Sequence, residues 1–78
     1  MTTMTITMSE SDAWTVLESL NSQYDWYRLS AQNQEDSRSY RAAFADSAND
    51  VARIYNSLVD TLTPDAMHLR ALTCADLD

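Results

Sequence analysis

The sequence contains no glycine, no lysine, one histidine and one cysteine in its 78 residues. Without glycine, the chain lacks the phosphate-binding loops that need close backbone approach or a positive φ. His68 alone cannot form a histidine cluster for zinc, and a catalytic triad would depend on this one residue. Cys74 has no second cysteine for an intramolecular disulfide, which favours a reducing compartment. These absences predict a protein that is not an enzyme and that binds no metal and no cofactor.

The chain also lacks long apolar and basic segments. No run of about 18 apolar residues is present, which argues against a transmembrane helix. The first 27 residues contain no arginine or lysine, whereas a secretory signal begins with a basic region. Together with the single cysteine, these features predict a cytoplasmic protein.

Positive charge is scarce, because five arginines stand against twelve acidic residues and leave a net charge of −7. Such a chain repels DNA, RNA and anionic membranes, since binding to nucleic acid depends on basic groups that displace counterions. A partner bound through charge should therefore be basic. The alternative is that the acidity serves solubility only.

Two stretches carry apolar residues at spacings of 4, 3, 4, 3 and 4, which is the pattern of a helix with one buried stripe. The first stripe follows the candidate caps Ser9 and Ser11 and predicts a helix over 10–31. The second predicts a helix over 37–62, capped by Ser37. The stripes consist of Ala13, Leu17, Leu20, Tyr24, Tyr27 and Ala31, and of Phe44, Ala48, Val51, Tyr55, Leu58 and Leu62.

Polar residues at the continuation of the first stripe, including Gln34 and Arg38, make residues 32–37 a connector between two antiparallel helices. Thr63 and Pro64 resemble the start of a third helix over 64–74, with an apolar side that contains Leu69 and Leu72. The predicted fold is therefore all-α: a single domain over 9–78, built as an antiparallel hairpin with a short third helix in a three-helix bundle. Homodimer formation would cover the remaining outer faces.

Residues 1–8 are predicted to be a flexible or extended N-terminal segment. Met4, Ile6 and Met8 alternate with threonines, so the segment is either disordered or a short strand that pairs with the sheet edge of a partner.

Acidic residues recur on the outward sides of both predicted helices. Glu18 and Asp25 are seven residues apart, about 10 Å along one line, and Asp12 is expected on nearly the same side. Asp46 and Asp50 are one turn apart, roughly 6 Å, a separation near that of successive phosphates. The candidate binding acids, which can occupy a basic groove built for nucleic acid, are Asp12, Glu18, Asp25, Asp46, Asp50 and Asp60. The alternative is an ordinary solvated surface, and Arg53 interrupts the second line.

Trp26 is the strongest candidate for a contact residue. Because Tyr24 and Tyr27 belong to the inner stripe, Trp26 should point away from the other helix, with Leu29 near the same outer side. An exposed tryptophan beside a leucine and acids is typical of a protein-binding hot spot. The alternative is that Trp26 packs under the third helix or in a dimer. Trp14 and Val16 flank the seam, where the third helix can bury them.

Small size, acidity, helical pattern and the absence of a catalytic motif resemble the helical anti-CRISPR proteins and other phage-encoded nucleic-acid-mimic inhibitors. The resemblance spans the chain through the six acids and Trp26, and has no specific motif. It implies a stoichiometric inhibitor in the cytoplasm of a host cell, which binds the basic surface of a CRISPR effector subunit or another defence protein and blocks access of target DNA. A second hypothesis is a structural or adaptor hairpin whose stripes mediate homo- or hetero-oligomerisation, including antitoxin-like partner binding.

Overall fold

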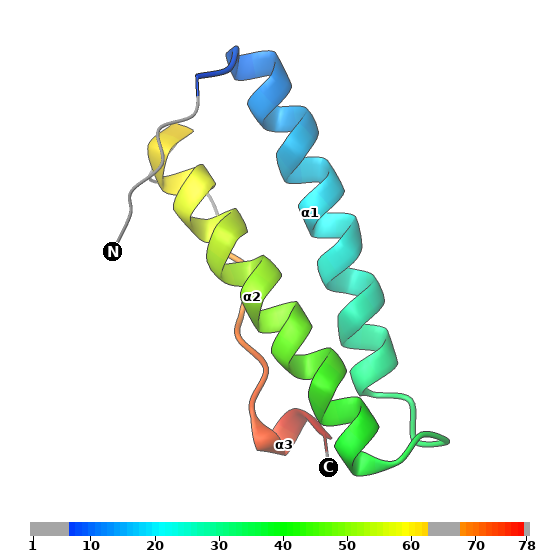
Figure 1. The fold of residues 1–78 in the computed structure, drawn as a ribbon. Coiled ribbons are helices and arrows are strands. Elements are labelled where there is room, and N and C mark those ends of the chain that lie inside the picture. The colour runs from blue at the N-terminus through cyan, green and yellow to red at the C-terminus, as the bar shows by residue number, and fades with distance from the viewer. Residues whose placement is uncertain (1–6, 63–67, 78) are drawn as a thin grey trace.

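The computed structural model describes residues 7–62 and 68–77, and all regular structure in these ranges is helical. The helices are α1 (Glu10–Ala31), α2 (Arg38–Leu62) and α3 (Cys74–Leu77). α1 and α2 lie alongside each other and run in opposite directions, joined by residues 32–37 (Figure 1). The all-α prediction is confirmed. Most of the predicted N-terminal segment, residues 1–6, lies outside the described residues, and residues 7 and 8 have no regular structure.

Local capping sets the bounds of the long helices. Ser9 accepts a hydrogen bond from the Asp12 N–H at 3.1 Å, so it is the N-cap predicted for α1. α1 ends where the Gln32 N–H donates to the carbonyl oxygens of Arg28 and Leu29. Ser37 accepts from the Tyr40 N–H at 3.2 Å at the start of α2. The predicted helices over 10–31 and 37–62 are therefore confirmed to within one residue.

The core lies between α1 and α2. From the first stripe Ala13, Leu17, Tyr24 and Ala31 are buried, and Leu20 and Tyr27 are half-buried. In the second stripe only Ala48 and Val51 are buried, while the other four residues are half-buried. α2 also buries a second side, which the sequence did not predict, consisting of Arg41, Ala45, Ala52 and Val59.

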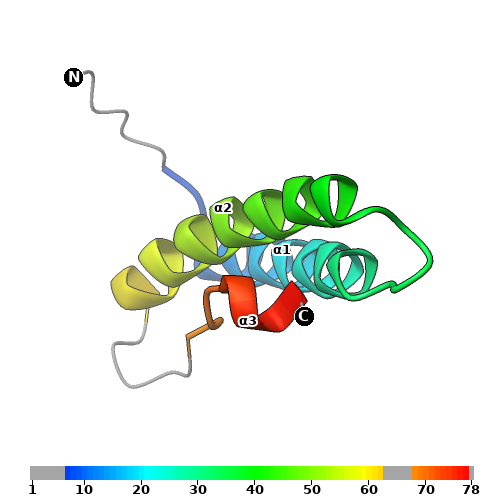
Figure 2. The ribbon, with the colours of Figure 1, turned by 90° about the horizontal axis from the view of Figure 1, so that it is seen from below.

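The predicted third helix over 64–74 is wrong at residues 68–73, which are not helical. Residues 64–67 lie outside the described residues, and α3 covers only the four residues Cys74–Leu77. Residues 68–77, here called the C-terminal strap, lie on one side of the α1–α2 pair (Figure 2). Leu72 and Leu77 are buried there with the core residues of α1 and α2. The described chain therefore adds to the hairpin a strap that is non-helical over 68–73 and ends in the short helix α3, and not a third long helix.

Candidate protein-binding surface

Four aromatic rings gather where the hairpin turns, two from each long helix. Trp26 lies edge-to-face on Tyr27 and on Phe44, with ring centroids 5.3 and 5.5 Å apart. Tyr40 lies edge-to-face on Phe44 at 4.9 Å. Such contacts contribute about 0.5–1.5 kcal/mol each beyond simple burial. These four residues are called the aromatic cluster.

Two of the four rings in the aromatic cluster are largely open to solvent, while Tyr27 and Phe44 are half-buried. Trp26 is 59% exposed and Tyr40 57%. Trp26 is thus exposed as predicted, but the expectation that it points away from the other helix is wrong, because its ring contacts Phe44 of α2. Leu29 is exposed as well. Trp26 therefore contributes both to packing between the helices and to the surface.

Further apolar side chains extend from the cluster along the hairpin. On α1, Val16 and Leu20 precede Tyr27 at helical spacing, and on α2 Val51 and Ile54 follow Phe44 in the same way. Val16 is 36% exposed and Ile54 44%. Trp14 is exposed too. The expectation that a third helix buries Trp14 and Val16 is therefore wrong. Ile54 and Tyr40, which lies one turn before Phe44, were not among the predicted contact residues, although their helical spacing from Phe44 is visible in the sequence.

The apolar side chains that extend from the aromatic cluster along α2 lie on the side of this helix that the strap leaves uncovered. The strap contacts α2 through Asn49 and Asn56. Ile54 is five residues after Asn49, which places it roughly 140° around the helix at 100° per residue. Figure 2 likewise shows the strap on one side of the long helices. The uncovered side, with the aromatic cluster, Val16 and Ile54, is called the open face.

All six predicted acids are exposed, but they do not converge on one surface. Asp46 and Asp50 precede Ile54 by two turns and one turn, and Asp12 precedes Val16 by one turn. These three acids therefore border the open face. Glu18 and Asp25 follow the other side of α1 with Leu29. The expectation that Asp12 shares their side is wrong, because six residues from Asp12 to Glu18 rotate the helix by about 600°, leaving them roughly 120° apart.

Two of the predicted acids pair with arginines, and a third contacts the histidine of the strap. Asp25 lies 3.5 Å from the Arg28 guanidinium and Asp50 3.7 Å from that of Arg53. Asp60 lies 2.6 Å from the His68 Nε2 in the strap. Within the described residues Asp12, Glu18 and Asp46 make no ion pair. An uninterrupted strip of phosphate-like charge is therefore not present on either helix, and the acids nearest to exposed apolar surface are Asp12, Asp46 and Asp50.

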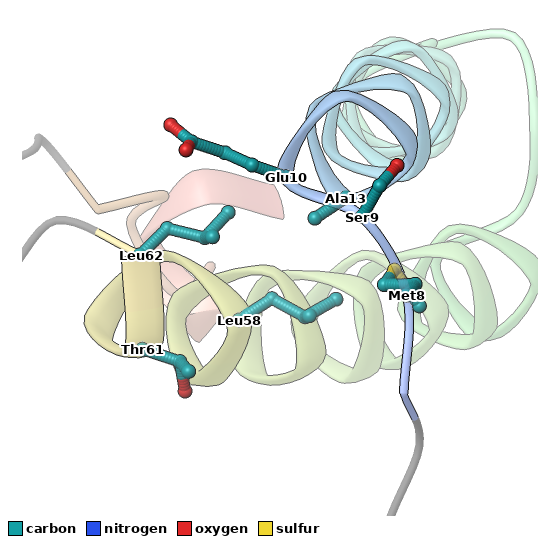
Figure 3. A pocket seen from close by; sticks show the side chains of 7 residues that line it. All are labelled: Met8, Ser9, Glu10, Ala13, Leu58, Thr61 and Leu62. Atoms are coloured by element: carbon teal, nitrogen blue, oxygen red, sulfur yellow. The ribbon is translucent and has the colours of Figure 1, made fainter.

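A cavity of about 410 Å³ lies at the opposite end of the hairpin, between the start of α1 and the end of α2 (Figure 3). It is lined by Met8, Ser9, Glu10, Ala13, Leu58, Thr61 and Leu62. Glu10 is its one ionisable side chain, and the Glu10 carboxylate accepts a long hydrogen bond of 3.5 Å from the Trp14 indole N–H. One carboxylate among mainly apolar groups provides no acid–base pair for catalysis.

Within residues 7–62 and 68–77, no three histidine, cysteine or acidic side chains gather at a site that could hold a metal ion. Neither long helix contains a stretch apolar enough to cross a membrane, as judged over the same residues. Comparisons of the chain with protein-family models, with curated proteins and with solved structures found no match. What the molecule does must therefore be inferred from its own surface.

Proposed function

We propose that this chain is a small inhibitor that acts by stoichiometric binding to a basic surface of a nucleic-acid-handling protein, in the manner of the anti-CRISPR proteins it resembles. The observation that carries the proposal is the open face, where Trp26 and Tyr40 are more than half exposed. Exposed aromatics that sit on a firm base are typical of binding hot spots. Here the base is Phe44, on which both rings rest.

Charge defines the partner. The chain has a net charge of −7, and the open face is bordered by Asp12, Asp46 and Asp50. Acids at the border of an apolar patch steer a basic partner into place and avoid the cost of burying charge at its centre. Asp46 and Asp50, roughly 6 Å apart along α2, are the pair best spaced to replace two phosphates of a bound nucleic acid.

Shape defines how the partner binds. The described chain lacks a third long helix, so a basic amphipathic helix of the partner, laid along the open face, would complete the three-helix arrangement predicted from the sequence. Helices commonly bind in this way, with apolar anchors at turn-to-turn spacing. Trp26, Val16 and Ile54 would contact the apolar side of that helix, and the bordering acids would pair with its basic residues.

The test is inhibition of target-DNA binding in a panel of purified CRISPR effector complexes. We expect one complex to lose DNA binding at stoichiometric inhibitor, and this inhibition to weaken as salt rises, because the pairing is electrostatic. Asp46→Asn with Asp50→Asn should weaken inhibition at least about tenfold, in line with the loss of two interfacial charge contacts.

A matched control changes the same charge on the other side of the molecule. Glu18→Gln with Asp25→Asn also removes two negative charges, but these residues lie away from the open face. Equal loss of inhibition in both double variants would show a general effect of net charge and would contradict the proposed surface. So would full inhibition by Trp26→Ala.

The exposed apolar residues Val16 and Ile54 favour a second candidate, the adaptor hairpin that oligomerises through this same face. An assembly of this kind depends on apolar contact, so it should be insensitive to salt. Sedimentation of the wild type and of Ile54→Ala at low and high salt separates the candidates. A salt-independent dimer that Ile54→Ala dissociates would favour the adaptor.

A further inference from the structure

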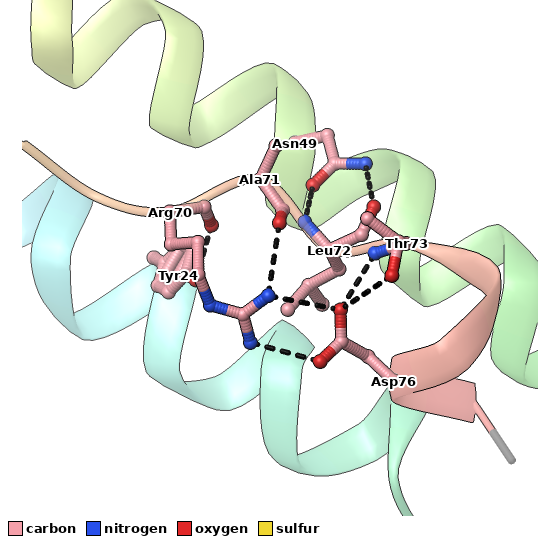
Figure 4. Close-up of polar contacts among 7 residues, drawn as sticks. All are labelled: Tyr24, Asn49, Arg70, Ala71, Leu72, Thr73 and Asp76. Atoms are coloured by element: carbon pink, nitrogen blue, oxygen red, sulfur yellow. Dashed lines mark hydrogen bonds and ion pairs between the residues drawn. The ribbon is translucent and has the colours of Figure 1, made fainter.

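The helices hold the strap by its backbone. The side-chain amide of Asn49 accepts from the Leu72 N–H at 2.6 Å and donates to the Leu72 carbonyl oxygen at 3.0 Å (Figure 4). Asn56 does the same for Leu69, at 2.8 and 3.0 Å. Each asparagine thus satisfies both backbone groups of one strap residue. Such a pairing accepts any residue except proline, which lacks the N–H.

The two amides match the repeat of an extended peptide. Asn49 and Asn56 are seven residues apart on α2, a rise of about 10 Å. Leu69 and Leu72 are three residues apart, which in an extended chain is also about 10 Å. The Tyr24 hydroxyl donates to the Arg70 carbonyl oxygen between them, at 2.6 Å. α1 and α2 therefore present donors and acceptors in register with an extended backbone.

Only a few strap side chains are buried in this arrangement. Leu72 and Leu77 are buried and Leu69 is half-buried. The exposed residues of the strap are His68, Arg70, Ala71, Thr73, Cys74 and Ala75. A segment bound in this way therefore needs only two leucines three residues apart and an apolar residue further along the chain. A segment this exposed is also the part of a fold that opens most readily.

Other contacts stabilise the strap from within. Arg70 donates to both carboxylate oxygens of Asp76, at 2.8 and 3.1 Å. Asp76 also accepts from the Thr73 N–H at 2.7 Å and from the Thr73 hydroxyl at 3.2 Å. These bonds join strap residues to each other and not to α1 or α2. The strap can therefore be weakened without alteration of the residues that hold it.

We propose that Tyr24, Asn49 and Asn56, the strap site, form a peptide-binding site for an extended segment of a partner protein with leucines three residues apart. The strap is then a built-in occupant that competes with this segment. The strap itself is the template for the ligand, since it shows which backbone and leucine pattern the site accepts. A second copy of the chain would bring another net charge of −7 and is disfavoured by repulsion. This site lies across the hairpin from the open face and is independent of it.

The experiment uses the full chain and a fluorescent synthetic peptide of residues 68–77, with serine at the cysteine position and both ends blocked. Cys74, which is exposed, carries a second fluorophore that reports release of the strap. We expect saturable binding accompanied by strap release. Asp76→Ala, which weakens only the competitor, should tighten binding about tenfold, because the apparent affinity rises with the fraction of open sites.

Substitutions in the strap site itself should weaken peptide binding, whereas Asp76→Ala should tighten it. Asn49→Ala weakens the site for the strap and for the peptide alike, so its effect is measured in a chain whose own strap carries Leu69→Ser and Leu72→Ser. In that chain Asn49→Ala should weaken peptide binding by about tenfold or more, as expected for the loss of two hydrogen bonds. Asn56→Ala tests the same pairing at Leu69 if Asn49→Ala loses helical circular dichroism. Gln23→Ala removes an exposed side-chain amide of α1 that lies about 100° around the helix from Tyr24, so it is the matched control and should bind as wild type.

Three results would overturn the proposal. The first is a folded Asp76→Ala protein that binds the peptide no better than wild type. The second is equal binding of a peptide in which serine replaces both Leu69 and Leu72. The third is a wild-type dimer that the peptide dissociates, since this would assign the strap site to a second copy of the chain.

Discussion

Tyr24 connects the core to the strap, and substitutions can measure the contributions of its ring and its hydroxyl to stability separately. The ring is buried, with the residue only 5% exposed, and the hydroxyl donates to the Arg70 carbonyl oxygen at 2.6 Å. Tyr24→Phe removes the hydroxyl and keeps the ring. We expect a loss of about 1 kcal/mol in the free energy of unfolding, the usual contribution of one hydrogen bond. Tyr24→Ala also removes the ring, and should cost about 3–5 kcal/mol.

These magnitudes are large for a chain of this length. A typical stability of roughly 0.05–0.15 kcal/mol per residue gives about 4–12 kcal/mol for 78 residues. Tyr24→Ala should therefore cost a large part of this free energy, and all of it for a wild type at the lower end of the range. Tyr24→Phe should remain folded, with a Tm about 4–8 °C lower.

Urea and thermal unfolding followed by far-ultraviolet circular dichroism measure both effects. Tyr40→Phe is the matched control, because Tyr40 is largely exposed and its hydroxyl has no hydrogen bond to any described residue. It should change the free energy of unfolding by less than about 0.5 kcal/mol. If Tyr24→Phe were as stable as Tyr40→Phe, the hydroxyl would not hold the strap and the described contact would be wrong.

Two further predictions concern the surface and the strap. Trp26→Ala loses its ring contacts with Tyr27 and Phe44, so urea unfolding should show a loss of about 1–3 kcal/mol with helix content unchanged; complete unfolding would make Trp26 part of the core. The hydrogen bond from Arg70, followed by that from the Thr73 N–H, holds the pKa of Asp76 well below its usual range. Ionised Asp76 therefore stabilises the strap above its unfolded pKa of about 3.9, and this contribution is lost as pH falls below about 4 towards the folded pKa. A fluorophore on Cys74 should report strap release in that acid range, and the same transition in Asp76→Asn would contradict the assignment.

The long helices could be predicted from the sequence because their signals are local. The serine caps act within three residues, and each apolar stripe repeats over consecutive turns. The broken register between the stripes located the connector for the same reason. Burial of Arg41 could not be predicted in this way, because its guanidinium donates to the Leu77 carbonyl oxygen, 36 residues away.

The prediction of a third helix was wrong for a related reason. The Thr63–Pro64 start and the spacing of Leu69 and Leu72 are signals of helix, but they describe only neighbouring residues. Asn56 and Asn49 bond the backbone of these leucines from 13 and 23 residues away. Side-chain amides thereby replace the hydrogen bonds that a helix would have provided. A single sequence gives no sign of such long-range pairing.

The candidate site was predicted in part. Exposure of the six acids and of Trp26 and Leu29 followed from the inner stripes. Which of these residues share one face could not be predicted, because it depends on which side of the hairpin the strap occupies. Tyr40 and Ile54 belong to the site only because the opposite side of α2 is taken by Asn49, Asn56 and the strap.

The strap also has a consequence for the order of folding. The Tyr24–Arg70 hydrogen bond joins residues 46 positions apart, whereas the hairpin closes through the short connector of residues 32–37. Contacts between distant residues form late, because the entropy of closing the larger loop must be overcome first. The hairpin should therefore assemble before the strap docks. Substitutions at Leu72 or Asp76 should then accelerate unfolding and leave the folding rate nearly unchanged.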